Sequence, residues 1–176
     1  SISIDKIAAI CNSFNGIVAV DEAYIEFSYV LSATTLLKKF PNLVVMRTLS
    51  KAYAMAGIRI GSIIASSEVI TILQRVLSPY PISQVCSELA LQALSPLGIY
   101  YTKNNISKIK LQRQYLEKML VRCPDVVNIY QSDANFILVI FKDAEAIYKK
   151  LKSSGIIVRN RSNEIANSLR ITVGTS

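Results

Sequence analysis

The side chains with the clearest capacity for chemistry gather around one lysine. Lys51 lies in the segment 47–61, which reads RTLSKAYAMAGIRIG and combines hydroxyls and further cations with small residues that allow close backbone packing. A lysine among such residues is a candidate for partial burial, and desolvation favours the neutral amine that attacks carbonyl groups. Taken alone, a lysine after a strand is most often an ordinary surface residue, so a second observation is needed.

That second observation is an acid and a phenol that precede the lysine. Asp21 ends the apolar run 17–20, stands 30 positions before Lys51, and is followed three residues later by Tyr24. In isolation this pattern is typical of a capped turn with a core aromatic. However, the apolar run 43–46 leads toward Lys51 in the same way, and open α/β sheets bind ligands at the carboxyl ends of their strands. We therefore expect Asp21 and Lys51 to lie at one edge of a sheet.

The residue types that this chain lacks limit its chemistry. It contains no histidine, which excludes Ser-His-Asp or Cys-His catalysis and histidine-ligated zinc from its own residues. The cysteines, Cys11, Cys86 and Cys123, are widely separated in apolar surroundings, so we interpret them as buried free thiols. Catalysis by this chain must rest on Lys, Tyr, Asp, Glu, Ser, Thr or Arg.

Composition indicates a folded protein outside the membrane. Of the 176 residues, 51% are hydrophobic and 18% are charged, which is enough for the core of one or two domains. No apolar run is long enough to span a bilayer and the N-terminus lacks a signal-peptide layout, so we expect a cytoplasmic protein without membrane or metal partners. The formal net charge of +8 suits anionic small molecules, whereas a nucleic-acid-binding role would rest on charge alone.

The N-terminal part of the chain predicts an α/β fold. Its strands are apolar runs without polar alternation, which suits strands buried on both faces of a mixed, mostly parallel sheet covered by helices. Helices are indicated by longer stretches that end before proline or glycine. The expected strands are 17–20, 43–46 and 60–65, and the expected helices are 32–40, 68–77 and 83–94.

The character of the chain changes after Pro96 and Gly98, where we place a domain boundary. The expected elements are a helix over 104–122, strands 126–130 and 135–141, a helix over 144–152, and strands 156–158 and 169–173. Gly155 fits the C-terminal cap of the 144–152 helix. This order predicts a small α+β domain. The expected domains are therefore residues 1–98 and 99–176.

The first half carries a family resemblance. Its pattern comprises Asp21-x-x-Tyr24, Ser50-Lys51 and Arg59-x-Gly61. This pattern resembles the fold-type I pyridoxal-phosphate (PLP) enzymes, the aspartate aminotransferase superfamily. The resemblance implies that residues 1–98 are the C-terminal portion of the PLP-binding large domain. It also implies that Lys51 forms a Schiff base with the cofactor aldehyde and later transfers the substrate proton.

The same resemblance gives roles to the residues around the lysine. Asp21 would pair with the pyridine nitrogen of PLP, and Tyr24 would donate to the phenolate oxygen of the ring. Ser50 and Arg59 would hold the cofactor phosphate, with Thr48 as a weaker candidate because family members vary there.

The C-terminal motifs, together with the stretch 79–83, narrow the resemblance to the histidinol-phosphate aminotransferase family. The segments that carry it are 79–83 (PYPIS), 132–136 (SDANF), 155–159 (GIIVR) and 169–175 (LRITVGT). The resemblance implies transfer of an amino group from histidinol phosphate to 2-oxoglutarate, which gives imidazole acetol phosphate and glutamate. Arg170 would bind the glutamate carboxylate and, together with Arg159, the substrate phosphate. Arg161 is close enough to replace Arg159 in this role, and Asn135 is interpreted as structural.

The resemblance also implies parts that this chain lacks. Family members carry, before the position of Asp21, a loop and helix N-terminus that cradle the cofactor phosphate, an aromatic that stacks on the ring, and an asparagine near its phenolic oxygen. A tyrosine of the partner subunit completes the phosphate site of the homodimer. We therefore expect a fragment that by itself binds PLP weakly and has little or no transaminase activity.

Two other kinds of protein remain open on the sequence alone. Threonine-phosphate decarboxylase resembles this family closely and also binds a phosphorylated substrate. A non-catalytic aminotransferase-like domain that senses a ligand or binds a partner belongs to a different functional class. Conversion of the bound cofactor by glutamate would identify an aminotransferase.

Overall fold

The computed structural model describes residues 1–174, which form two compact units. The first unit is Ser1–Lys103 and the second begins at Asn104. Each is described by itself below. Thr175, the last residue of the segment 169–175, lies outside the described residues.

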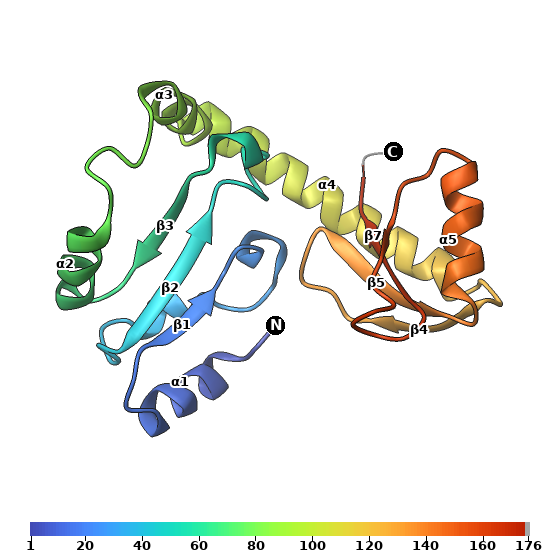
Figure 1. Ribbon diagram of the computed structural model, residues 1–176, viewed down its shortest axis with the longest axis horizontal. Coiled ribbons are helices and arrows are strands. Elements are labelled where there is room, and N and C mark those ends of the chain that lie inside the picture. Colours follow the sequence, from blue (N-terminus) through green and yellow to red (C-terminus); the bar gives the residue numbers. More distant parts are fainter. Residues whose placement is uncertain (175–176) are drawn as a thin grey trace. The chain divides into compact units, whose positions relative to one another are not determined.

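The first unit is built on a three-stranded mixed sheet in the order β1-β2-β3 (Figure 1). β1 (Val18–Asp21) runs parallel to β2 (Leu43–Thr48), and β3 (Gly61–Ile64) is antiparallel to β2. The expected α/β class with a mixed sheet is thus confirmed. The strand lengths and positions follow the predicted apolar runs closely.

The core of this unit lies between β2 and the helix α1 (Ile4–Ser13). Ile7 and Cys11 of α1 pack with Phe40, Leu43 and Val45 in one buried cluster. Residues 4–13 carry apolar side chains at helical spacing and Asp5 in the first turn, where an acid is favourable. This helix was not predicted from the sequence, although its apolar spacing was present.

The expectation that all three strands are buried on both faces was wrong. β3 is exposed along its whole length, and β1 alternates between half-buried and exposed residues. Within the described residues, β1 and β3 each pair only with β2, so only the central strand has neighbours on both sides. Burial of the cysteines was also overestimated, because Cys86 and Cys123 are partly exposed and only Cys11 is buried.

The predicted helix over 32–40 is replaced by a short 3-10 helix, Ala33–Leu36. The Oγ atom of Ser32 accepts a hydrogen bond from the backbone of Thr34, and the carboxylate of Glu22 accepts one from the backbone of Ala33. These side-chain acceptors hold the start of the segment in a tight turn, and the two threonines are poor helix formers. A second 3-10 helix, Ile25–Phe27, follows β1, and a third, Ala56–Ile58, precedes β3.

In the described part of the chain, three α-helices lie between β3 and β4. α2 (Ser67–Val76) has no buried residue, and α3 (Gln84–Ala93) buries only alanines. α4 (Pro96–Leu120) begins at Pro96, eight residues earlier than predicted, because proline is favoured in the first turn of a helix. Gly98 permits the sharp connection from α3, since a Cβ atom there would collide with the carbonyl oxygens of Gln92 and Ala93.

The second unit is a four-stranded antiparallel sheet in the order β4-β5-β7-β6. Its strands are β4 (Val126–Tyr130), β5 (Phe136–Phe141), β6 (Arg159–Asn160) and β7 (Ser168–Thr172). One face of the sheet packs against α5 (Ala144–Ser153) and the C-terminal part of α4 (Figure 1). Ile137, Val139 and Leu169 are fully buried on this face.

The predicted strand over 156–158 was wrong, because pairing begins only at Arg159. Gly155 adopts a left-handed φ of 78° after α5, as its expected capping role requires. The backbone N–H of Ile156 then donates to the carbonyl of Leu151 in the last turn of α5. Ile156 therefore completes the helix end before the chain can enter the sheet.

Candidate functional site

The carboxyl edge of the parallel strand pair brings the Asp21 and Lys51 segments together. Asp21 is the last residue of β1 and is paired with Met46, while β2 continues to Thr48. Because the strands are parallel, the residues that follow each of them lie at the same edge of the sheet. The Nζ atom of Lys51 lies 5.5 Å from the centroid of the Tyr24 ring. The lysine and the phenol therefore come from two different strand ends to one place.

Backbone hydrogen bonds close the loop that carries Lys51. The N–H of Leu49 donates to Ile60, the N–H of Met55 donates to Leu49, and the N–H of Ala54 donates to Lys51, at 3.0–3.1 Å. Ala54 adopts a positive φ of 56° in this turn. The Lys51 side chain is exposed. The prediction that Lys51 is partly buried was therefore wrong for the described part of the chain. The small neighbours allow a tight turn, but no described segment covers the amine.

The carboxylate of Asp21 is oriented locally. Its Oδ1 atom accepts a hydrogen bond of 2.9 Å from the backbone N–H of Ala23. The side chain is exposed at the strand end. A carboxylate that is oriented in this way can accept a hydrogen bond from a protonated ring nitrogen that approaches from the solvent side.

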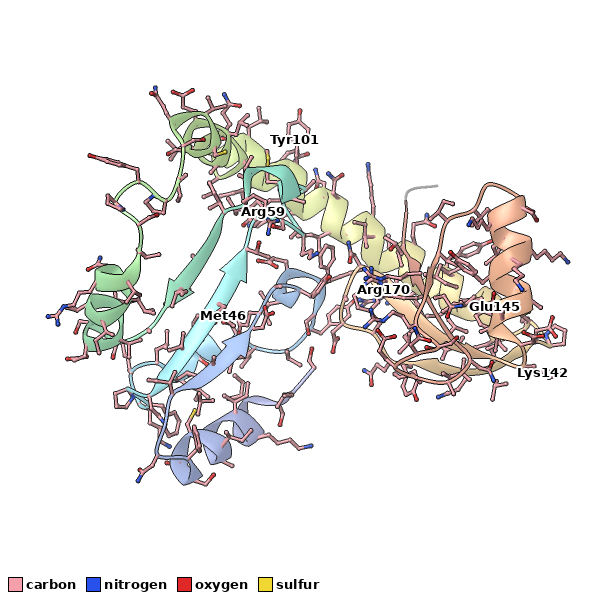
Figure 2. All side chains as sticks on the ribbon, in the orientation of Figure 1. Met46, Arg59, Tyr101, Lys142, Glu145 and Arg170 are labelled. Atoms are coloured by element: carbon pink, nitrogen blue, oxygen red, sulfur yellow. The ribbon has the colours of Figure 1, made fainter. Side chains whose placement is uncertain are left out.

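The phosphate-binding candidates lie on both sides of the lysine. The Oγ1 atom of Thr48 is 2.9 Å from the Oγ atom of Ser50 and accepts the Ser50 backbone N–H. Arg59 has a left-handed φ of 57°, and its Nη1 atom donates to the carbonyl of Ala56 at 3.1 Å. Figure 2 shows Arg59 beyond the end of β2, away from Met46 in the middle of that strand. Two hydroxyls and an exposed guanidinium thus flank the same loop.

Gly61 has a packing role in this arrangement. It is paired with Thr48, and a Cβ atom added to it would lie 2.8 Å from the carbonyl oxygen of Arg47. Real Cβ atoms do not approach a backbone oxygen so closely. The glycine in the Arg59-x-Gly61 pattern therefore lets β3 leave the loop directly against β2.

An ion pair between the buried Glu22 and the partly exposed Arg47 joins the two strand ends, and neither residue was a predicted site residue. Glu22 is 6% exposed and accepts from the backbone of Ala33 at 2.6 Å, from Ser32 Oγ at 2.7 Å and from Arg47 Nε at 3.1 Å. Arg47 Nη2 lies 3.0 Å from Glu22 Oε2 and donates to Ser32 Oγ at 2.8 Å. This Glu22–Arg47–Ser32 network ties the end of β1 to β2. Its only sequence signal was a pair of charged residues directly after apolar runs.

A second acid lies close to this network. Burial raises the pKa of Glu26, while the positive charge of Arg47 acts in the opposite direction and the negative charge of Glu22 adds to the rise. The Oε2 atom of Glu26 is buried without a hydrogen-bond partner among residues 1–174. The neutral carboxyl is therefore favoured in the folded chain over a wider pH range than for an exposed glutamate.

In the second unit, the two candidate substrate arginines are cross-strand neighbours. Arg159 of β6 is paired with Arg170 of β7, and directly opposite residues of two antiparallel strands project from the same face. The guanidinium carbon of Arg170, labelled in Figure 2, lies 4.9 Å from the centroid of the Phe136 ring. Arg161 instead forms an ion pair of 3.2 Å with Glu164. The geometry therefore favours Arg159 over Arg161 as the partner of Arg170.

Asn135 takes part in pairing through its backbone. Its carbonyl accepts the N–H of Val173 at 2.9 Å, which extends the contact between β5 and β7 by one residue. This contact accords with the structural interpretation of Asn135, which stays a prediction for its side chain.

The described residues contain neither a membrane-spanning helix nor a cluster of metal-binding side chains. No helix within residues 1–174 combines the length and apolar character that a membrane crossing requires. In the same part of the chain, no three His, Cys, Asp or Glu side chains gather in a way that could hold a metal ion.

Comparison with known proteins identifies the class to which this fold and site belong. The family model for aminotransferase class I and II matches residues 3–176, so the chain belongs to that family.

Within this family, the chain is similar to proteins named histidinol-phosphate aminotransferase. The chain is 44% identical over 161 residues to histidinol-phosphate aminotransferase of Yersinia pseudotuberculosis, which covers 90% of this chain and 42% of the relative. It is 42% identical over 180 residues to the enzyme of that name from Xanthomonas axonopodis, covering 100% of this chain and 50% of the relative. The chain thus spans about half the length of the curated relatives it matches.

Two solved structures of histidinol-phosphate aminotransferases have the same fold as this chain. The histidinol-phosphate aminotransferase of Clostridium acetobutylicum matches with a TM-score of 0.89 at 23% identity, over 99% of this chain and 55% of that one. The Sinorhizobium meliloti enzyme, solved in complex with pyridoxal-5'-phosphate, matches with a TM-score of 0.85 at 25% identity, over 98% and 48% respectively.

Proposed function

We propose that this chain is the C-terminal half of a PLP-dependent histidinol-phosphate aminotransferase. Residues 1–98 would be the C-terminal portion of the PLP-binding large domain, and residues 99–176 the small C-terminal α+β domain. The observation that carries the proposal is the meeting of Lys51 and Tyr24 at the strand edge where Asp21 ends β1. An amine, a phenol and an acid at one edge match the needs of a PLP ring.

The residues at this edge fit the cofactor in type and position. Bound there, PLP would supply an electron-withdrawing ring that accepts the electron pair released at the substrate carbon. Lys51 would hold the aldehyde end and move the proton at the substrate carbon, which its exposed, loop-mounted amine can reach. Asp21 would hold a proton on the ring nitrogen. Tyr24, whose ring already lies beside the Lys51 amine, would donate its hydroxyl to the phenolate oxygen.

The hydroxyls and guanidinium around Lys51 would hold the cofactor phosphate. Ser50 and Thr48 are hydrogen-bonded to each other, so either hydroxyl can turn its proton toward a phosphate oxygen. Arg59 would exchange its hydrogen bond to the Ala56 carbonyl for one to a phosphate oxygen. A charged acceptor of this kind forms a stronger hydrogen bond.

Arg159 and Arg170 would bind the anionic end of the substrates. Like charges placed directly opposite on neighbouring strands repel, and an anion between them removes this cost. Guanidinium groups donate hydrogen bonds to both carboxylate and phosphate oxygens, so one site can serve glutamate, 2-oxoglutarate and the phosphorylated amine in turn.

The complete enzyme would be a cytoplasmic homodimer of longer chains. The exposed apolar side chains of β3 and α2, such as Ile63, Ile72 and Val76, support this proposal, because a further part of the protein would cover them. Without the remainder, these 176 residues would bind PLP weakly and turn over little or no substrate.

The second candidate is a decarboxylase of phosphorylated threonine. The L-threonine-O-3-phosphate decarboxylase of Porphyromonas gingivalis has the same fold, with a TM-score of 0.81 at 22% identity. The aminotransferase is favoured because relatives of that name reach 42–44% identity. Glutamate added to the complete, PLP-loaded protein separates the two, since only the aminotransferase converts the cofactor to its pyridoxamine form.

Reductive labelling tests the central assignment. The chain would be mixed with equimolar PLP, reduced with borohydride and mapped by peptide mass spectrometry. We expect the label at Lys51, its loss in Lys51→Ala, and no change in Lys6→Ala, which removes another exposed lysine. A label spread evenly over surface lysines would refute the assignment.

A further inference from the structure

The ring of Phe136 lies against the guanidinium of Arg170, with 4.9 Å between the ring centroid and the guanidinium carbon. The two residues come from neighbouring antiparallel strands, in which Phe136 is paired with Thr172 and Leu138 with Arg170. Phe136 therefore lies diagonal to Arg170 on the sheet face opposite the buried cluster. Contacts of this kind hold a guanidinium by the attraction between a cation and the electron-rich ring face.

The position of Phe136 is fixed by contacts on both sides of it. Ser132 Oγ donates to the Phe136 carbonyl and accepts the backbone N–H of Ala134. Arg113, which is 4% exposed, donates from Nη1 to the Ala134 carbonyl at 2.6 Å. This hydrogen bond from a buried, charged donor supports the turn 132–136 from one side. The Val173 N–H bond to Asn135 attaches the same turn to β7.

The guanidinium of Arg170 is planar, and its N–H groups point outward in that plane. The Phe136 ring beside the guanidinium carbon limits the positions that this plane can take. A fixed plane favours two-point contact with a carboxylate or phosphate. The Nε atom of Arg170 is buried and has no hydrogen-bond partner among residues 1–174. An anion in the plane of the guanidinium could accept the hydrogen bond that this Nε–H group lacks.

We propose that Phe136 is a positioning residue for the substrate anion: its ring orients Arg170, and the turn held by Arg113 orients the ring. This inference rests on the proposed anion-binding function of Arg170 and adds the group that sets its geometry. Phe136 itself does not touch the anion. Removing the ring face should therefore weaken anion binding without removing any charge.

The first test is made on the unmodified chain by NMR. If the ring lies over the guanidinium, the Arg170 side-chain protons resonate upfield and show contacts to the Phe136 ring protons. In Phe136→Leu this upfield shift is lost, whereas Phe136→Tyr keeps it. Absence of the shift and of the contacts in the unmodified chain overturns the proposal, even if every variant fails to fold.

The second test titrates the chain with inorganic phosphate. Phe136→Leu should weaken binding by about three- to tenfold, in line with a cation–π contact at a partly exposed site, and Phe136→Tyr should restore it. Tyr130→Leu, which removes an exposed aromatic from β4 of the same unit, should leave binding unchanged. Equal affinity in Phe136→Leu and the unmodified chain overturns the positioning role, while unchanged binding in Arg170→Ala refutes the anion site itself.

Discussion

Glu22→Ala should destabilise the first unit more than any exposed charge removal. The substitution takes away the acceptor for the Ala33 N–H, for Ser32 and for Arg47 together. A hydrogen bond to a charged group contributes about 1.5–3 kcal/mol, and breaking a buried ion pair costs about 3–5 kcal/mol. Arg47 keeps 33% of its side chain exposed, so water replaces part of what it loses. The expected loss is therefore about 2–4 kcal/mol in the free energy of unfolding.

Urea unfolding of the chain measures this loss. With a slope of about 2 kcal/mol per molar, the midpoint for the first unit should fall by about 1–2 M. Glu88→Ala is the matched control in the same unit, because Glu88 is exposed and accepts only a surface hydrogen bond from Gln84. Its effect should stay within about 0.5 kcal/mol. If the two substitutions cost the same, the network does not hold the two strand ends together.

Four further outcomes are expected. Because burial raises the folded-state pKa of Glu26, ionisation of this carboxyl disfavours folding. Its contribution to stability is highest below the ordinary glutamate pKa and falls as pH rises through the raised value. Glu26→Gln should therefore gain stability relative to the unmodified chain as the pH rises above the ordinary glutamate pKa, which urea unfolding of both proteins at a series of pH values measures. Gly61→Ala should cost about 1–3 kcal/mol, because the new Cβ meets the Arg47 carbonyl, whereas Gly57→Ala, with open space around it, should be nearly neutral in thermal unfolding. Asp21→Ala should weaken PLP retention and slow turnover in the complete protein, seen by cofactor absorbance after dialysis and by rate. The 176-residue chain alone should show little or no transamination when it is supplied with PLP and glutamate, and turnover at the rate of a full-length relative would contradict the proposal that it is an incomplete half.

The strand ends could be predicted from the sequence because they depend on local pattern. Short apolar runs that stop at Asp21 and before Lys51 mark buried strands with a functional edge, and the structure has strands at those positions. The helix over 4–13 had an equally local signal in its apolar spacing. Such features require no knowledge of distant partners.

Other features depended on contacts between distant residues. Glu22 finds Ser32 ten positions away and Arg47 twenty-five positions away, and no spacing rule predicts either bond. The same network converts the predicted helix over 32–40 into a single tight turn. Exposure of Lys51 could not be predicted either, because it depends on which segments cover the loop and not on the loop's own small residues.

The placement of the arginines depends on strand register. Leu169 of β7 and Val173, the residue after this strand, face the buried cluster, while Arg170 between them projects to the opposite face. A slip of one residue would turn Arg170 into the core and Leu169 into solvent. Burying the charge of Arg170 and exposing Leu169 would both raise the free energy of the folded state. The backbone bonds from Val173 to Asn135 and from Arg161 to Ser168 fix this register on both sides of β7. The hydrophobic core of the second unit therefore sets the orientation of Arg170, and an anion site can persist there without any ligand to organise it.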